Sequence, residues 1–217
     1  RGLMLGIYAT TLSLGFAAGP LIFSWTGSGG YLPFSIACLI IMVAAVPLLA
    51  AFRKSPDFKG KDHVPLLPYV WKVPTATAAV LVFGAVETGG MSLLPVYGTH
   101  VGYTEAQSAL LMTMIGVGNV LFQIPIGMLS DRVKDRRIVL VVISVLGLVG
   151  MLALPYAAAS WWWTAGLLFL WGGMIAGLYT VGLSHLGAKL TDRELASANA
   201  AFIFCYAFGM LIGPQMI

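Results

Sequence analysis

Glu87 is the residue whose type and position most clearly predict chemistry in this chain. It is the only Asp, Glu, Lys or Arg within any of the long apolar stretches of the sequence. A charge at the middle of a bilayer costs about 3 kcal/mol on insertion scales, so such a carboxyl is protonated, paired or open to a wet cavity. A carboxyl that exchanges its proton as a cavity opens to alternate sides is what proton-coupled transport requires. We therefore interpret Glu87 as a proton-coupling candidate. The alternative is a buried structural acid that is hydrogen-bonded to a neighbouring helix.

Seven further polar residues are candidates for the wall of a substrate cavity. Each stands within an apolar stretch and carries a side chain that can form hydrogen bonds: Thr88, Ser92, Asn119, Gln123, Tyr179, Thr180 and Ser184. Asn119 and Gln123 are four residues apart and so share one face of a helix. For this pair we favour a role in binding one helix to another over substrate contact. For Tyr179, Thr180 and Ser184 both roles stay open.

The sequence does not indicate other kinds of site. It contains no Walker loop, no dinucleotide fingerprint and no His-Glu-x-x-His zinc motif. Cys38 and Cys205 stand alone in apolar segments, so we predict no cofactor, no metal site and no disulfide. Residues 182–187 resemble the Gly-x-Ser-x-Gly elbow of serine hydrolases, but this spacing is one residue too long. Adjacent helical residues also point about 100° apart, so His185 cannot act as the base for Ser184, and we predict that the protein is not an enzyme.

The elements that position these residues are predicted to be membrane-spanning helices. Apolar residues make up 59% of the 217 residues and charged residues 9%, against about 25% charged residues in soluble domains. A helix of about 20 apolar residues can cross a bilayer. Seven stretches meet this length: residues 3–25, 31–52, 74–97, 108–129, 138–159, 161–185 and 195–217. We therefore predict an all-α membrane protein, a bundle of several spans. We also expect a piece of a longer protein, because there is no initiator Met and the chain stops within an apolar run.

The positions of the positive charges predict how these spans are oriented. All twelve Lys and Arg fall in connections on one side, at residues 1, 53–73, 130–137 and 187–194, and none falls on the other. Cationic loops stay in the cytoplasm, so loops 53–73 and 130–137 are predicted to be cytoplasmic. The net charge of +4 therefore reports topology and gives no argument for nucleic-acid binding. The loop at residues 53–73 is the longest connection, and its prolines argue against a long helix there.

The turn at residues 127–137 resembles the loop signature of the major facilitator superfamily of transporters. It reads Gly-x-Leu-Ser-Asp-Arg and then Asp-Arg-Arg, with the motif residues Gly127, Leu129, Asp131, Arg132, Asp135, Arg136 and Arg137. The resemblance implies a twelve-helix protein of two six-helix halves. Residues 1–52 would then be the last two helices of the first half, residues 53–73 the linker, and residues 74–217 the first five helices of the second half. It also implies that Asp131 holds an inner gate shut by contacting the N-terminus of the 3–25 helix. We therefore expect Asp131 within hydrogen-bond reach of residues 1–6, or of Arg132 or Arg136.

Two segments of the chain echo each other. Gly15, Gly19 and Pro20 form a Gly-x-x-x-Gly-Pro motif, and Gly209, Gly213 and Pro214 form another at the same depth. Small residues four apart let helix backbones approach closely, and the proline bends the helix. We therefore predict that all four glycines are buried against other helices. Residues 15–20 resemble a fifth-helix motif of proton-coupled exporters, although the Gly pair that usually follows is replaced by Leu-Ile-Phe-Ser.

The resemblance also implies an arrangement of the helices. Spans 3–25, 108–129 and 195–217 should lie where the two halves meet, and spans 31–52 and 138–159 should face lipid. Polar residues are scarce in those last two spans, which agrees with this expectation.

Taken together, these features predict a secondary active transporter that works by alternating access. Efflux of a small amphipathic molecule, driven by protons through Glu87, is the first hypothesis. A proton-coupled uptake carrier is the second, and a non-transporting membrane scaffold or sensor is the third. The expected partners are a small-molecule substrate, protons and the lipid bilayer, with no nucleic acid. We expect a monomer as the full-length protein and a bacterial inner membrane as its location.

Overall fold

The computed structural model describes residues 2–27, 29–51, 66–190 and 192–216, and this part is all-α. Its long helices are α1 (Gly2–Thr26), α2 (Leu32–Ala51), α4 (Pro74–His100), α5 (Glu105–Arg132), α6 (Arg136–Ala157), α7 (Trp161–Ile175), α8 (Gly177–Lys189) and α9 (Asp192–Ile212). Helix α3 (Leu67–Lys72) precedes α4, and a 3-10 turn (Gly213–Gln215) follows α9. Among the described residues, five of the predicted spans are long and apolar enough to cross a membrane: α4, α5, α6, α7 with α8, and residues 194–215. The other two predicted spans coincide with α1 and α2, which are 25 and 20 residues long.

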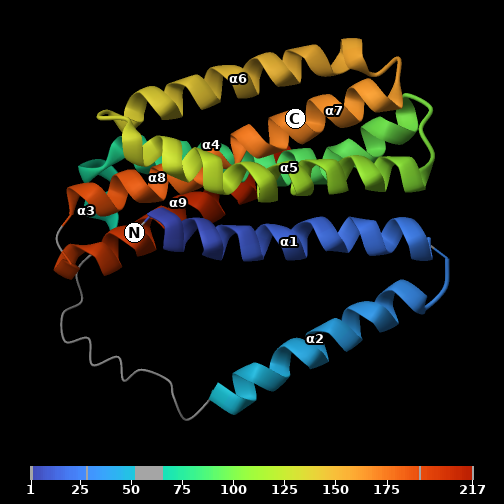
Figure 1. Ribbon diagram of the computed structural model, residues 1–217, viewed down its shortest axis with the longest axis horizontal. Helices are drawn as coiled ribbons and strands as arrows, with labels where there is room; N and C mark the ends of the chain where they lie inside the picture. The colour runs from blue at the N-terminus through green and yellow to red at the C-terminus, as the bar shows by residue number, and fades with distance from the viewer. Residues whose placement is uncertain (1, 28, 52–65, 191, 217) are drawn as a thin grey trace.

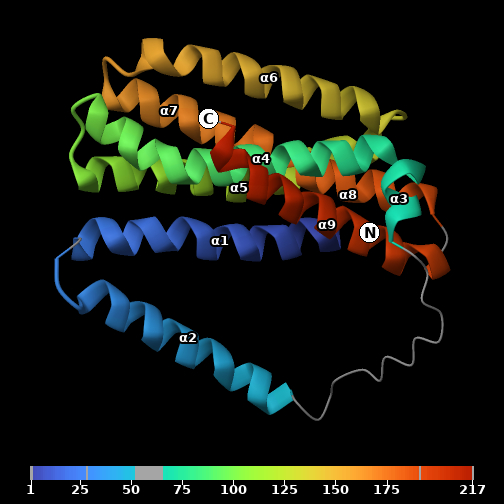
Figure 2. The ribbon, with the colours of Figure 1, turned by 180° about the vertical axis from the view of Figure 1, so that it is seen from behind.

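Helix α5 lies at the centre of the bundle. It packs along α1 on one side and along α7 on the other, and it also contacts α4 and α8. Helix α9 packs mainly along α4. Helix α6 lies at one edge of the bundle and α2 at the opposite edge, with α1 between α2 and the other helices (Figures 1 and 2). The site described below therefore lies where α1, α4, α5 and α7 come together.

The peripheral position of α6 follows from its sequence pattern. Its buried residues Val139, Leu140, Ile143 and Gly147 are spaced by one, three and four positions, which places them on one stripe of the helix. This stripe faces α7 and α8. Except for the partly buried Leu154, the remaining valines and leucines of α6 are exposed, as expected for side chains that face lipid. The prediction that span 138–159 lies on the outside of the bundle agrees with this packing.

The second Gly-x-x-x-Gly-Pro motif is packed as predicted. Gly209 and Gly213 lie against the backbone of α4 at Leu81 and Ala85, which are also four residues apart. Gly84 lies between them on α4 and faces the backbone of α9 at Met210. The two helices can approach so closely because none of these glycines carries a Cβ.

The first Gly-x-x-x-Gly-Pro motif is packed differently, and the prediction that Gly15 and Gly19 are buried against other helices is wrong. Both glycines are exposed, and a Cβ added at either would meet nothing within 4 Å. The buried stripe of α1 instead contains Ser13 and Ala17, and Ala17 packs against Gly116 of α5. Residues two positions apart on a helix point about 200° apart. Gly15 and Gly19 therefore lie off the stripe of α1 that packs directly against α5.

Two of the predicted spans are not continuous α-helices in the structure. The predicted helix at residues 161–185 is divided at Ala176 into α7 and α8. Glycines follow and precede this point at Gly172, Gly173 and Gly177, and glycine is the least favourable helix residue after proline. The last span changes from α-helix to a 3-10 turn at Gly213, where Pro214 cannot donate a backbone hydrogen bond.

The described end of the predicted linker forms the short helix α3. Helix α3 has Pro68 in its first turn. An ion pair between Lys72 and Glu194 holds it against α9. The Lys72 amine also lies 5.4 Å from the centre of the Tyr69 ring. The hydrogen bond to Glu194 raises the pKa of Lys72 above its ordinary value. Residues 53–65, which make up the rest of the predicted linker, lie outside the described residues.

Candidate functional site

Glu87 stands at the midpoint of α4 and is half-buried. Its carboxylate oxygen Oε2 accepts a hydrogen bond from the hydroxyl of Tyr206 on α9. The Tyr206 ring is itself held by neighbours, since it stacks on Phe83 at 5.8 Å between ring centres and meets Tyr179 edge-on at the same distance. The predicted proton-coupling candidate therefore has a fixed hydrogen-bond donor on one side.

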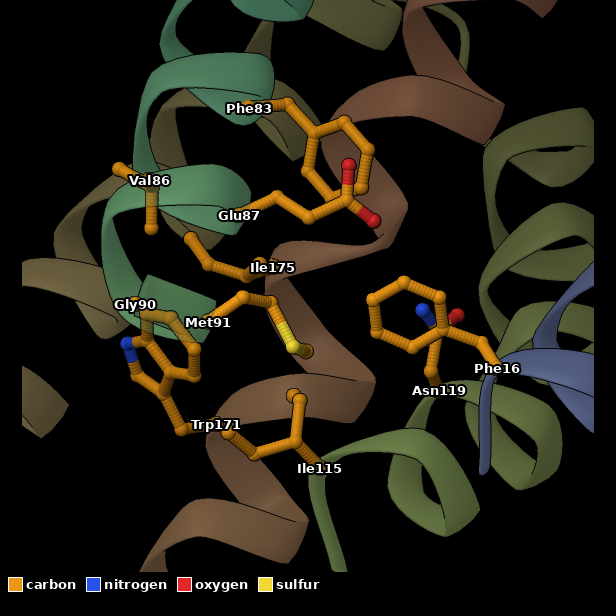
Figure 3. A pocket seen from close by; sticks show the side chains of 11 residues that line it. Phe16, Phe83, Val86, Glu87, Gly90, Met91, Ile115, Asn119, Trp171 and Ile175 are labelled. Carbon is orange, nitrogen blue, oxygen red and sulfur yellow. The ribbon is translucent and has the colours of Figure 1, made fainter. Parts of the chain in front are cut away.

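A small cavity opens on the other side of Glu87. It has a volume of about 20 Å³, and one water molecule needs roughly 10–15 Å³ on this measure. Its lining residues come from α1, α4, α5 and α7: Phe16, Phe83, Val86, Glu87, Gly90, Met91, Ile115, Asn119, Trp171, Gly172 and Ile175. Figure 3 shows Glu87 and Met91 extending from α4 toward Phe16 and Asn119. The cavity thus has one carboxylate and one amide within otherwise apolar and aromatic walls.

The walls of the cavity are held by contacts behind them. The indole Nε1 of Trp171 donates a hydrogen bond to the Gly147 carbonyl of α6 at 2.9 Å, which fixes the ring against the cavity. Gly172 lies against Ile115 of α5, where a Cβ would come within 2.7 Å of the Ile115 Cα. Close packing of α5 on α7 therefore depends on glycine at this wall. An indole or a thioether beside a carboxylate suits a molecule that combines an apolar body with a polar or cationic group.

Asn119 belongs to a chain of hydrogen bonds that crosses three helices. Its Oδ1 accepts from the Ser13 hydroxyl of α1 at 3.1 Å and from Nε2 of Gln123 at 2.8 Å. The Oε1 of Gln123 accepts in turn from the Thr180 hydroxyl of α8. Ser13, Gln123 and Thr180 are all buried. The structure therefore places Asn119 and Gln123 in helix-to-helix contact, the role that we favoured from the sequence, and Asn119 alone of the two also lines the cavity.

The remaining predicted cavity residues are not brought together at this cavity. Thr88 follows Glu87 on α4, and its hydroxyl is buried without a hydrogen-bond partner among the described residues. Ser92 is exposed and donates to the Thr88 carbonyl at 2.8 Å. Tyr179 packs among Phe83, Phe202 and Tyr206. Ser184 lies five residues further along α8, and its carbonyl accepts a hydrogen bond from Arg136 of the charged turn. Their role in substrate binding stays a prediction.

The charged turn is organised around Arg136. Its guanidinium donates to three oxygens: the Ser130 carbonyl at 3.3 Å, the Ser184 carbonyl at 3.2 Å and Asp131 Oδ1 at 3.1 Å. Ser130 and Ser184 lie near the C-terminal ends of α5 and α8, where a positive charge is favourable. Arg136 therefore joins the ends of α5 and α8 to the start of α6. Arg136 is also the hydrogen-bond partner of Asp131, and it is one of the partners that we predicted for this residue.

The other residues of the turn have separate positions. Asp135 caps α6 by accepting a hydrogen bond from the Arg137 backbone N–H at 3.0 Å. Gly127 is buried, whereas Leu129, Arg132 and Arg137 are exposed. Arg1 and the side chains of residues 2–9 lie outside the described residues, and so does the predicted contact of Asp131 with them. The gating role of the turn stays a prediction.

A larger groove lies near the C-terminal end of α1. It has a volume of about 460 Å³ and is lined by Gly19, Pro20, Phe23, Pro95, Thr99, Glu105, Ser108, Ala109 and Met112. These residues come from α1, α4 and α5. Gly19 and Pro20, predicted as a helix-bending motif, thus stand at the wall of an open groove, and α1 is described as one continuous helix through both.

Several residues of the site were not among those predicted from the sequence. Ser13, Phe16, Met91 and Trp171 gave no signal, because apolar and weakly polar residues of these types occur throughout the spans. Tyr206, a polar aromatic residue within a span, is a weaker candidate for the cavity wall on the sequence alone. Among the described residues, no group of three or more His, Cys, Asp and Glu side chains could hold a metal ion.

Comparisons with known proteins define the class of the molecule. A family model of the Major Facilitator Superfamily matches residues 1–214. Relatives include the uncharacterized MFS-type transporter YfkF of Bacillus subtilis, which is 25% identical over 99% of this chain and 56% of its own length. Others are uncharacterized MFS-type transporters of Yersinia enterocolitica, 26% identical over the whole of this chain and 56% of the relative, and of an Enterobacter species, 28% identical over 99% and 55%.

The described helices and these matches make the chain a multi-pass helical membrane protein. It belongs to the major facilitator superfamily, because the family match covers nearly all of its residues. The chain spans about half the length of the curated relatives that it matches. The recognition made from the charged turn is therefore confirmed.

Proposed function

We propose that the full-length protein is a secondary active transporter that moves a small amphipathic molecule out of the cell in exchange for protons. The observation that carries this proposal is the position of Glu87. It is an acid at the midpoint of a membrane span and lines a cavity between helices of both predicted halves. Substrate and ion sites of secondary transporters lie near the bilayer midplane between their repeats. Membership of the superfamily supports the same class of activity.

The chemistry of the site supports proton coupling through Glu87. A protonated carboxyl is tolerated in an apolar wall, whereas an ionised one needs water, a donor or a cation. Tyr206 supplies one donor, and the cavity has room for about one water molecule beside the carboxyl. Alternate opening of the two sides of the protein would change this environment, and Glu87 would bind a proton on one side and release it on the other.

The substrate class and direction follow from the walls and from the α1 motif. Phe16, Phe83, Met91 and Trp171 provide apolar and aromatic contacts for an amphipathic molecule. The similarity of residues 15–20 to a motif of proton-coupled exporters favours efflux. We further propose a bacterial inner membrane, to which the bacterial relatives point, with residues 53–73 and 130–137 in the cytoplasm and the protein as a monomer.

Transport in proteoliposomes tests this proposal. A thermal-stability screen of the full-length protein against small amphipathic molecules first identifies a solute that stabilises it. Glu87→Gln keeps the shape of the protonated acid, so it should fold and bind this solute but lose accumulation driven by an imposed pH gradient. Glu105→Gln, at an exposed acid of the outer side, is the matched control and should accumulate the solute like the parent.

The outcomes separate the possible functions. If Glu87→Gln concentrates the solute as well as the parent, Glu87 is a structural residue and proton coupling through it is wrong. If the parent takes up solute along the proton gradient in place of exchanging it, the protein is an uptake carrier. A parent that moves no stabilising solute contradicts the transport proposal itself.

A further inference from the structure

The hydrogen bond between Ser13 and Asn119 crosses from the first predicted half of the protein to the second. Ser13 is on α1 and Asn119 on α5, and the bond from Oγ to Oδ1 is 3.1 Å long. Ser13 is buried, with 6% of its surface exposed. The two helices pack along much of their length, and Ala17 and Gly116 meet one turn further along the interface. A polar contact at this depth is therefore enclosed by apolar packing on either side.

The carbonyl oxygen of Asn119 is fully used by its two donors. An amide oxygen has two lone pairs, and those of Asn119 accept from Ser13 and from Gln123. Thr180 donates to the oxygen of Gln123, which directs the Gln123 amino group toward Asn119. The chain therefore favours one orientation of the Asn119 amide, with its oxygen toward α1.

The amino group of Asn119 is left for the cavity. It has two N–H donors, and no acceptor for them is found among the described residues. Asn119 lines the cavity that Glu87 lines from the other helix, and in Figure 3 its nitrogen lies on the side of Met91 and Glu87. The cavity has room for about one water molecule between the two groups. A carboxylate and an amide thus line the same small cavity, whose other walls are apolar or aromatic.

The other groups around Glu87 are few. Tyr206 of α9 donates to it, and Tyr179 of α8 packs on Tyr206. The parts of α1, α5 and α7 that line the cavity contribute Phe16, Ile115, Asn119, Trp171, Gly172 and Ile175, none of which titrates in the physiological range. Asn119 is therefore the polar group of the opposite wall that can respond when Glu87 changes its charge.

We propose that Asn119 is a positioning residue that couples the ionisation of Glu87 to the contact between α1 and α5. The proposal rests on the proposed function, in which Glu87 gains and loses a proton. An ionised carboxylate accepts a hydrogen bond from the Asn119 amino group, directly or through one water, and a charged acceptor makes this bond stronger. It holds the amide in the orientation in which its oxygen binds Ser13. Protonation of Glu87 weakens this hold and loosens α1 from α5.

Distance measurements between α1 and α5 test the coupling without any solute. Spin labels are attached at Trp25→Cys and Ala106→Cys, two exposed positions near the outer ends of these helices, in full-length protein whose Cys38 and Cys205 are replaced by Ser and Ala. Pulsed electron resonance then gives the ratio of short to long distances over a series of pH values from about 3.5 to about 9, which begins below the ordinary glutamate pKa of about 4.3.

The expected response is modest and specific. A hydrogen bond between membrane helices is worth enough to change a population ratio about threefold, so the parent should favour the short distance about threefold more at the higher pH. Asn119→Leu, Ser13→Ala and Glu87→Gln should each remove this difference. Ser144→Ala is the matched control, because Ser144 bonds to its own helix at the Leu140 carbonyl, and it should respond like the parent.

Two results would contradict the proposed role of Asn119. If Ser13→Ala and Asn119→Leu keep the parental pH response, or if the parent shows none, Asn119 does not couple the two sites. Should Asn119→Leu fail to fold, Ser13→Ala decides the question, because it removes one hydroxyl group. The proposed function is judged separately by flux: pH-driven transport that survives in Glu87→Gln contradicts it, whatever the distances show.

Discussion

Substitution of Gly209 tests how tightly α9 is packed on α4. An alanine Cβ at this position would lie 2.9 Å from the Leu81 carbonyl carbon and 3.1 Å from the Ala85 nitrogen. Both are backbone atoms within a helix, and they cannot move aside as the end of a flexible side chain can. Gly209→Ala therefore requires the two helices to separate.

The size of the effect follows from two opposed terms. An alanine is favoured over glycine within a helix by up to about 1 kcal/mol, whereas overpacking costs about 1–3 kcal/mol. Because the contacts here are with backbone, we expect the upper part of that range and a net loss of about 2 kcal/mol. Such a loss lowers the ratio of folded to unfolded protein about thirtyfold.

The matched control is Gly166→Ala on α7. Gly166 is exposed, and a Cβ added there would meet nothing within 4 Å, so the alanine should leave stability unchanged or raise it slightly. Unfolding is followed by circular dichroism as sodium dodecyl sulfate is added to the protein in mild detergent. Equal stabilities of the two variants would refute the packing argument, and so would a more stable Gly209→Ala.

Two further predictions concern the ion pairs of Arg136 and Lys72. Arg136→Lys keeps the charge but cannot reach three oxygens at once, so it should lower the free energy of unfolding by about 1–3 kcal/mol. Arg137→Lys, at an exposed side chain, should change it little, and equal losses would contradict the role of Arg136. The pKa of Lys72 is raised by its ion pair with Glu194. The stabilisation from this pair is therefore fully present below the ordinary lysine pKa of about 10.4, and it is lost as the pH rises through the higher pKa of Lys72 in the folded protein. A fluorophore at Trp71→Cys in a background without other cysteines should then become more accessible to iodide. Glu194→Gln should make it accessible at all pH values, and an unchanged quenching curve would contradict the prediction.

Much of the fold is determined by the sequence alone, because a bilayer restricts what a chain can do. Long apolar stretches must form helices there, since no water satisfies the backbone. The one-sided distribution of Lys and Arg sets the orientation. Glu87 was identifiable as a site candidate for the same reason, since an isolated acid at mid-span is costly unless it is used. The charged turn also identified the family, because its residues recur as a short, continuous motif.

The faces of the helices were decided only by the tertiary structure. Lipid is as apolar as the interior of a helix bundle, so an apolar pattern does not show which side of a span meets protein. The two Gly-x-x-x-Gly-Pro motifs read alike, yet Gly209 and Gly213 pack against α4, while Gly15 and Gly19 touch no described helix because the stripe of Ser13 and Ala17 makes the contact with α5.

The packing of the helices also decided which residues contact one another at the candidate site. Glu87 and its donor Tyr206 are 119 residues apart in the sequence, and Ser13 and Asn119 are 106 apart. No local pattern links such residues. They meet because α4 lies along α9 and α5 lies along α1, and the close approach of these helices depends on small residues whose value appears only when a second backbone lies against them.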